Sequence, residues 1–150
     1  MNIPGVSAVL VLGLLLTASA APIGDDLFQS VHYIDHAKVS ATMIKGGQIV
    51  NDGSLVVLAN RRGAGEVEYH DHTNHVFIMV EGEATFVTGG TMVGARRTKP
   101  DQMVATSIEG GEVHHLSKGD IITVPAKTPH WWKDVSTKTI AYYAINIASR

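Results

Sequence analysis

Short apolar runs separated by glycine-rich turns fill the chain after Gly47. Turn sequences such as NDG, GAG, EGE, TGG, EGG and SKGD divide these runs, and no helical periodicity lies between them. The expected strands are Ile49–Val50, Leu55–Asn60, Val67–His72, Val76–Val80, Ala84–Thr88, Val113–Leu116, Ile121–Val124 and Thr139–Ile147. This pattern predicts one all-β domain over residues 48–150, a sandwich or a jelly-roll barrel.

Residues 89–112 interrupt the series with mixed, glycine-containing sequence. Connections longer than ~15 residues are usually functional or mobile. We therefore expect a loop that packs along the mouth of the barrel.

The first 20 residues are typical of a secretory signal peptide. The apolar run Val6–Leu16 has 11 residues, which as a helix would span roughly 16 Å against a ~30 Å hydrocarbon core. Ala18, Ser19 and Ala20 follow as a small-x-small cleavage pattern. The sequence predicts cleavage before Ala21, a secreted or periplasmic protein and no stable membrane span; an uncleaved anchor is the alternative.

Residues 21–47 form an N-terminal segment in which two short helices are expected, Asp25–Tyr33 and Asp35–Ile44. Asp35 is a good N-cap for the second helix, and two glycines at 46 and 47 would end it. His32 and His36 are four residues apart, but Asp35 separates them at a helix start. We do not expect them to bind a metal.

Charge and cysteine content narrow the function. The chain has 12 Lys and Arg against 14 Asp and Glu, a formal net charge of −2, so it offers no electrostatic footprint for nucleic acid. It has no cysteine and 8 histidines. A metal site would therefore need histidine and carboxylate ligands.

Three histidines fall within six positions of one strand-rich segment. His70 and His72 alternate along a strand and so share a face. If Thr73 and Asn74 form a two-residue turn, His75 lies directly across the hairpin from His72. His130 begins an extended stretch after a proline-bracketed turn and is a plausible fourth ligand. The predicted metal ligands are therefore His70, His72, His75 and His130.

Neighbouring positions suggest the surroundings of this site. Glu68 shares the strand face of His70 and is an alternative carboxylate ligand. Phe77, Met79 and Trp132 are candidates for an apolar pocket that would suit a planar substrate, although ordinary barrel core explains them equally well. His114 and His115 are adjacent and face opposite ways, so we expect surface or hydrogen-bonded roles.

These motifs resemble those of the cupin superfamily over roughly residues 50–147. Its first motif is Gly, five residues, His-x-His, three or four residues, Glu, six residues, Gly, and its second is Gly, five residues, Pro-x-Gly, two residues, His, three residues, Asn. The matching residues are His70, His72, Gly82, Gly119, Pro125 and His130. The departures are Ala64 for the first Gly, His75 for Glu, Lys127 for Gly and Asp134 for Asn, with two residues between His72 and His75.

The resemblance implies a jelly-roll (double-stranded β-helix) barrel that holds a metal. It also implies dioxygenase, isomerase, lyase or decarboxylase chemistry on a small organic molecule, and a homodimer. Four neutral imidazoles would leave a divalent ion its full +2 charge and suit Zn, Cu, Fe or Ni. The alternative is a non-catalytic metal-binding or small-ligand-binding protein, in which four histidines leave no open position on the ion.

Overall fold

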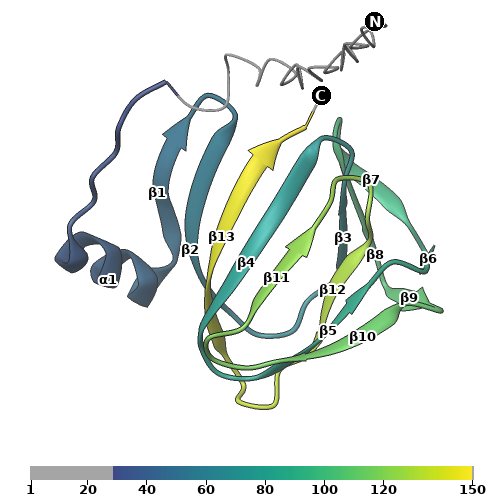
Figure 1. Cartoon of the computed structure of the whole chain (residues 1–150). Helices are drawn as coiled ribbons and strands as arrows, with labels where there is room; N and C mark the ends of the chain where they lie inside the picture. The colour runs from purple at the N-terminus through teal and green to yellow at the C-terminus, as the bar shows by residue number, and fades with distance from the viewer. Residues whose placement is uncertain (1–28, 150) are drawn as a thin grey trace, which may run out of the picture.

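The computed structural model describes residues 29–149, which form two facing β-sheets with a short helix on one side (Figure 1). The five-stranded sheet has the order β1-β2-β13-β4-β11, and the six-stranded sheet the order β10-β5-β12-β3-β8-β7. A separate pair, β6 and β9, projects beside the barrel. This architecture confirms the prediction of an all-β jelly-roll barrel.

The strands of the five-stranded sheet are β1 (Gly47–Asp52), β2 (Leu55–Arg62), β4 (Thr73–Glu81), β11 (Ile121–Val124) and β13 (Ile140–Ala148). Those of the six-stranded sheet are β3 (Val67–His70), β5 (Ala84–Thr88), β7 (Arg96–Lys99), β8 (Gln102–Ala105), β10 (Glu112–Leu116) and β12 (His130–Asp134). The small pair consists of β6 (Thr91–Val93) and β9 (Ser107–Glu109).

The alternating pattern of β4 shows how the sequence builds the interior. His75, Phe77 and Met79 are buried, whereas the residues between them are only partly covered. Because successive side chains of a strand point to opposite faces, one face of β4 enters the space between the sheets. Aromatic side chains from both sheets fill that core, with Phe86 and Trp132 at a ring-centroid distance of 4.4 Å.

Gly82 makes the corner between β4 and β5. Its φ of +83° favours glycine, and a Cβ there would lie 2.6 Å from the carbonyl oxygen of Thr139. A side chain at this position would therefore clash with backbone, which explains why glycine occupies the end of the first motif.

Helix α1 (His36–Lys45) covers the outer face of the five-stranded sheet. The Asp35 side chain accepts a hydrogen bond from the amide of Lys38 at 3.0 Å, as predicted for the N-cap. Met43 packs on Ala59 and Ala141 from β2 and β13. Within residues 29–149, no helix is long and apolar enough to cross a membrane.

Three sequence expectations about secondary structure need correction. Residues 29–33 are not helical, and residues 25–28 of that expected helix lie outside the described part, as does the predicted signal peptide. The expected loop 89–112 contains the four strands β6 to β9. All four residues of β7 are exposed, so this strand lacks the apolar alternation that marks a strand in sequence.

The third correction concerns the hairpin expected around Thr73 and Asn74. Strands β3 and β4 do not pair, because they belong to different sheets: β3 pairs with β8 and β12, and β4 with β13 and β11. Both residues of the expected turn lie inside β4. The two strands are joined by residues 71 and 72, where the chain crosses between sheets.

Candidate metal centre

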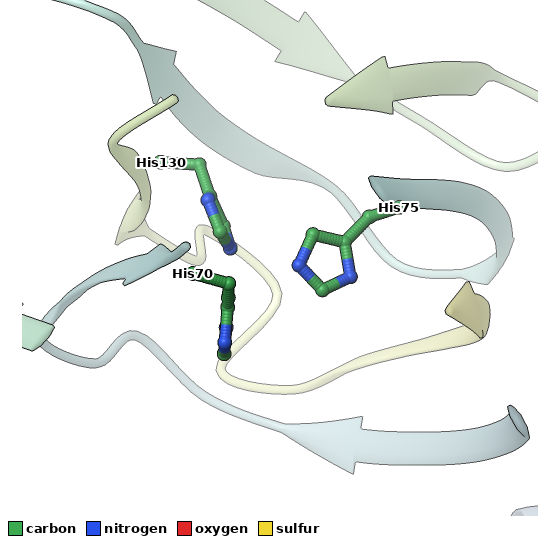
Figure 2. A group of neighbouring side chains, drawn as sticks. All are labelled: His70, His75 and His130. Carbon is green, nitrogen blue, oxygen red and sulfur yellow. The ribbon is translucent and has the colours of Figure 1, made fainter. Parts of the chain in front are cut away.

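Three imidazoles converge between the two sheets (Figure 2). They belong to His70, His75 and His130, and one nitrogen of each lies within 4.8 Å of the corresponding nitrogen of the other two. Their ring centroids are 4.9, 5.0 and 5.6 Å apart. Imidazole nitrogens grouped in this way suit one transition-metal ion.

Both sheets contribute residues to this cluster. The six-stranded sheet contributes His70, at the end of β3, and His130, at the start of β12. The five-stranded sheet contributes His75, which lies opposite Asn146 of β13 and Val124 of β11. The grouping of the three rings therefore depends on how the sheets face each other.

Hydrogen bonds fix the protonation of two rings. Nδ1 of His75 lies 2.8 Å from Oδ1 of Asn146, and Nδ1 of His130 lies 3.0 Å from the carbonyl oxygen of Thr128. Because these oxygens only accept, each Nδ1 carries the proton. Each neutral ring then presents an unprotonated Nε2, the arrangement found in metal-binding histidines whose other nitrogen donates to the protein.

The Nε2 atom of His75 provides the sharpest test of fit to a metal. This nitrogen is buried and has no hydrogen-bond partner among the residues that the structure describes. An unpartnered buried acceptor costs about 1–3 kcal/mol. A metal ion held jointly with the other two rings would satisfy it, so the residues fit the ion.

Burial keeps two of these histidines neutral. Desolvation lowers the pKa of His75, and it lowers the pKa of His130 to about 4. The hydrogen bonds that the two rings donate to Asn146 and Thr128 oppose these shifts without cancelling them. Because a metal binds only the neutral imidazole, both side chains are in the ligating form at neutral pH.

A cavity of about 200 Å³ opens beside the cluster. Phe77 and Trp132, which the sequence suggested as pocket residues, both line it, whereas Met79 is buried in the core and does not. The wall combines apolar and polar side chains from both sheets: Leu58, Phe77, Trp132 and Ala144 on one hand, and Asn60, Arg62, Glu68, Tyr142 and Asn146 on the other.

Glu68 brings a negative charge into this cavity. Its Oε1 accepts a hydrogen bond from Nη1 of Arg62 at 2.9 Å, and its Oε2 lies 3.8 Å from Nε2 of His70. Burial raises the pKa of the Glu68 carboxyl, but the nearby His70 ring and Arg62 guanidinium outweigh it and bring the pKa to about 2. Glu68 is therefore ionised under all ordinary conditions.

The structure does not bring the fourth predicted ligand to the cluster. His72 is exposed in the bend between β3 and β4. The shared face expected for His70 and His72 required both to lie in one strand, but β3 ends at His70. The observed group thus contains three of the four predicted histidines.

Three of the four remaining histidines lie elsewhere in the structure, as follows. His114 is hydrogen-bonded to Oγ1 of Thr88 at 2.9 Å, and His115 is exposed. His32 lies 2.9 Å from Oδ2 of Asp52, on the outside of the barrel.

Sequence reasoning missed two residues that contribute to the centre, Asn146 and Arg62. Asn146 follows His75 by 71 positions, so no local motif connects the two. The alternation of Tyr142, Ala144 and Asn146 in the last strand does indicate that all three share one face. It could have identified Asn146 as inward-facing, but not its partner.

The comparisons with known proteins agree with this geometry. The profile of the family described as Cupin matches residues 34–150. Since this match covers well over half of the chain, the protein belongs to the cupin family. No curated protein matches the sequence.

Solved structures with a similar fold share little sequence with this chain. The crystal structure of Fe(II) HppE has a TM-score of 0.51 and 18% identity, covering 68% of this chain and 50% of that chain. A cupin 2 conserved barrel domain protein from Rhodopseudomonas palustris has a TM-score of 0.48 and 14% identity, covering 70% and 61%. A cupin 2 conserved barrel domain protein from Salinispora arenicola CNS-205 has a TM-score of 0.46 and 13% identity, covering 68% of this chain and 73% of that chain. The chain thus spans about half the length of HppE.

Proposed function

We propose that this cupin binds one divalent transition metal through His70, His75 and His130 and acts on a small organic molecule in the adjoining cavity. The observation that carries this proposal is the buried Nε2 of His75, which has no partner among the described residues and faces two further imidazoles. An all-histidine set favours Zn, Cu, Fe or Ni over Mg or Ca.

The position of His72 favours catalysis over storage. Closed structural zinc sites use four protein ligands, whereas catalytic sites keep three and leave a position for water or substrate. With His72 exposed, the histidine cluster supplies three nitrogens, and the cavity lies next to them. When bound, the ion would polarise an oxygen of the substrate as a Lewis acid or support oxidation, according to its identity.

The surrounding residues of the chain have distinct tasks in this proposal. Asn146 and Thr128 orient the rings of His75 and His130. Phe77 and Trp132 keep one side of the cavity apolar and exclude water from it. Arg62 lies on the polar side, where its guanidinium neutralises the charge of Glu68.

The size of the cavity limits the substrate. Pockets for drug-sized ligands have volumes of about 300–1,000 Å³. At about 200 Å³, this cavity suits a smaller molecule. Oxygenase, isomerase or lyase chemistry on such a compound fits the site, and the neighbouring fold of HppE was solved with Fe(II).

The proposal also includes secretion of the protein and formation of a homodimer. The sequence of residues 1–20 supports removal of a signal peptide and a secreted or periplasmic location. The family resemblance supports a homodimer. N-terminal sequencing of the exported protein should begin at or near Ala21, and an intact Met1 in a membrane fraction would contradict export.

Metal analysis of protein purified without a histidine tag tests the proposed function. We expect about one ion per chain, with at least one exchangeable water, counted by magnetic relaxation of solvent protons on a paramagnetic ion. Absence of stoichiometric metal, after both purification and reconstitution, would contradict metal binding. A bound ion without exchangeable water would instead favour the non-catalytic alternative.

A further inference from the structure

A second cavity lies next to the one that the histidines line. It has a volume of about 210 Å³ and lies where β2 and β4 begin and β13 ends. We call it the end cavity, and the cavity beside the imidazoles the metal cavity. The end cavity is lined by Gly53, Ser54, Val56, Thr73, Asn146 and Ala148. Asn146 is the one described residue that lines both cavities.

Sheet register places Asn146 between the two spaces. Side chains two positions apart on a strand share a face, so Ala144, Asn146 and Ala148 of β13 lie on one face of the sheet. On the neighbouring strand β4, Asn146 has His75 as its partner, and Ala148 has Thr73. Ala144 lines the metal cavity and Ala148 the end cavity. The two cavities therefore occupy successive stretches of one sheet face, with Asn146 between them.

Side-chain size explains why this face carries two cavities. Alanine places only a methyl group above the sheet, so space remains over Ala144 and over Ala148. The longer side chain of Asn146 stands between them, and its Oδ1 lies 2.8 Å from Nδ1 of His75. This hydrogen bond holds the amide across the inner face, where it forms a wall between the two spaces.

We propose that Asn146 is a specificity-determining residue, which closes the metal cavity on this side and limits the length of the molecule that binds at the ion. The proposal rests on the proposed metal binding by the three histidines. The substrate class that follows is a compact molecule with an oxygen donor for the ion and no long chain. Without the wall, the cavities of about 200 and 210 Å³ would join and reach the range of about 300–1,000 Å³ that is typical of pockets for drug-sized ligands.

Asparagine and leucine are similar in size, which supplies a matched pair of variants. Asn146→Ala and Asn146→Leu both remove the hydrogen bond to His75, so any effect of that bond on the metal is common to both. Only Asn146→Ala also removes the wall. Comparison of the two variants therefore separates the effect of the wall from that of the hydrogen bond.

The experiment loads each protein with Co(II) and titrates it with acetate, butanoate and hexanoate, following binding by the visible absorption of the ion. In Asn146→Ala we expect hexanoate to bind at least about fivefold more tightly than butanoate, because burial of each methylene group raises affinity roughly fourfold. In the wild type and in Asn146→Leu the difference should be less than about twofold, because the wall keeps the added methylene groups out of the end cavity.

Ala148 provides a second control because it lines the end cavity and not the metal cavity. The larger side chain of Ala148→Leu should fill the end cavity. Combined with Asn146→Ala, it should abolish the gain in hexanoate affinity. By itself it should leave the length preference of the wild type unchanged.

The same length dependence in Asn146→Ala and Asn146→Leu, both folded and loaded with Co(II), would overturn the proposal. An effect of Ala148→Leu alone on hexanoate binding would also overturn it, as would bound Co(II) that responds to none of the carboxylates. If Asn146→Ala does not retain Co(II), Asn146→Ser, which also lacks the wall, replaces it in the comparison. Failure of the wild-type protein to bind Co(II) would instead refute the proposed function itself.

Discussion

Two histidine sites in this protein differ in whether the ring nitrogens have partners within the chain. On the outside, His32 meets Asp52 at 2.9 Å, and the same carboxylate oxygen accepts the amides of Gln29 and Ser30. Between the sheets, His75 buries a nitrogen without a partner among the described residues, next to two more imidazoles. The outer site is satisfied within the chain, and the inner one needs a ligand. A histidine beside other polar residues thus indicates metal chemistry only where a buried nitrogen is left over.

The two sites should differ most clearly in how the loss of a histidine changes metal affinity. We expect His75→Ala and His130→Ala to reduce metal affinity by more than about 100-fold, because each removes one of three nitrogens from the ion. His32→Ala should keep full occupancy. Elemental analysis after dialysis measures the difference, and circular dichroism of the metal-free variants verifies that they fold. Equal metal content in all three variants would refute the distinction.

As the pH falls, the buried histidine His130 should lower the stability of the metal-free protein before Asp52 does. The pKa of His130 is lowered from 6.5 to about 4 in the folded protein, so between these values the unfolded chain takes up a proton that the folded chain does not. Stability from this group is therefore complete above about pH 6.5 and decreases as the pH falls toward 4. At 1.36 kcal/mol per pKa unit, the loss is about 3 kcal/mol for the metal-free protein.

Denaturant titration of the metal-free protein at several pH values tests this expectation, with His130→Phe as the variant in which the dependence should weaken to the part that His75 contributes. Asp52 behaves differently. Its pKa is lowered to about 2, mainly by the hydrogen bond with His32, so its contribution is lost only as the pH falls below about 3.8. A stability curve that is flat between pH 6.5 and 4 would contradict the assignment of His130 as buried and neutral.

Loss of the outer pair should have a local effect. In Asp52→Asn the amides of Gln29 and Ser30 lose a charged acceptor, so we expect hydrogen exchange to become several-fold faster at residues 29–33. Exchange in β4 and β12 and metal content should not change. Hydrogen-exchange mass spectrometry resolves these segments. Faster exchange throughout the barrel would mean that Asp52 supports the whole fold.

The smallest effect is expected at His72. Because this side chain is exposed in the bend between β3 and β4, His72→Ala should change metal affinity by less than about twofold. Calorimetry against the wild type provides the measurement. A loss as large as that of His75→Ala would show that residues 71 and 72 rearrange to place His72 on the ion.

The sequence predicted the strands that are rich in apolar residues and failed where a strand is polar. Strands β4 and β13 consist mainly of apolar residues, which makes them visible without a structure. The exposed RRTK strand β7 carries none, so its sequence predicts a loop. Local patterns record burial, and a strand held mainly by backbone pairing at an edge leaves little trace in them.

In the candidate site too, local sequence motifs predict some residues, whereas contacts between distant strands cannot be predicted from them. His75 could be singled out because six residues separate it from Gly82, and the structure places it with His70 and His130. The hairpin that was to join His72 to this group was wrong because the sequence does not state which sheet a strand enters. Asn146 and Arg62 reach the centre through sheet register, which depends on contacts across the whole chain.

The division of the proposed ligands between two sheets has a mechanical consequence. His70 and His130 belong to one sheet and His75 to the other, and His70 and His130 are 60 positions apart in the chain. An ion shared among them would act as a cross-link that must break before the sheets can part. It would therefore slow unfolding, because separation of the sheets would have to await release of the ion. Resistance to proteolysis and heat would then follow the supply of metal in the surroundings of the protein.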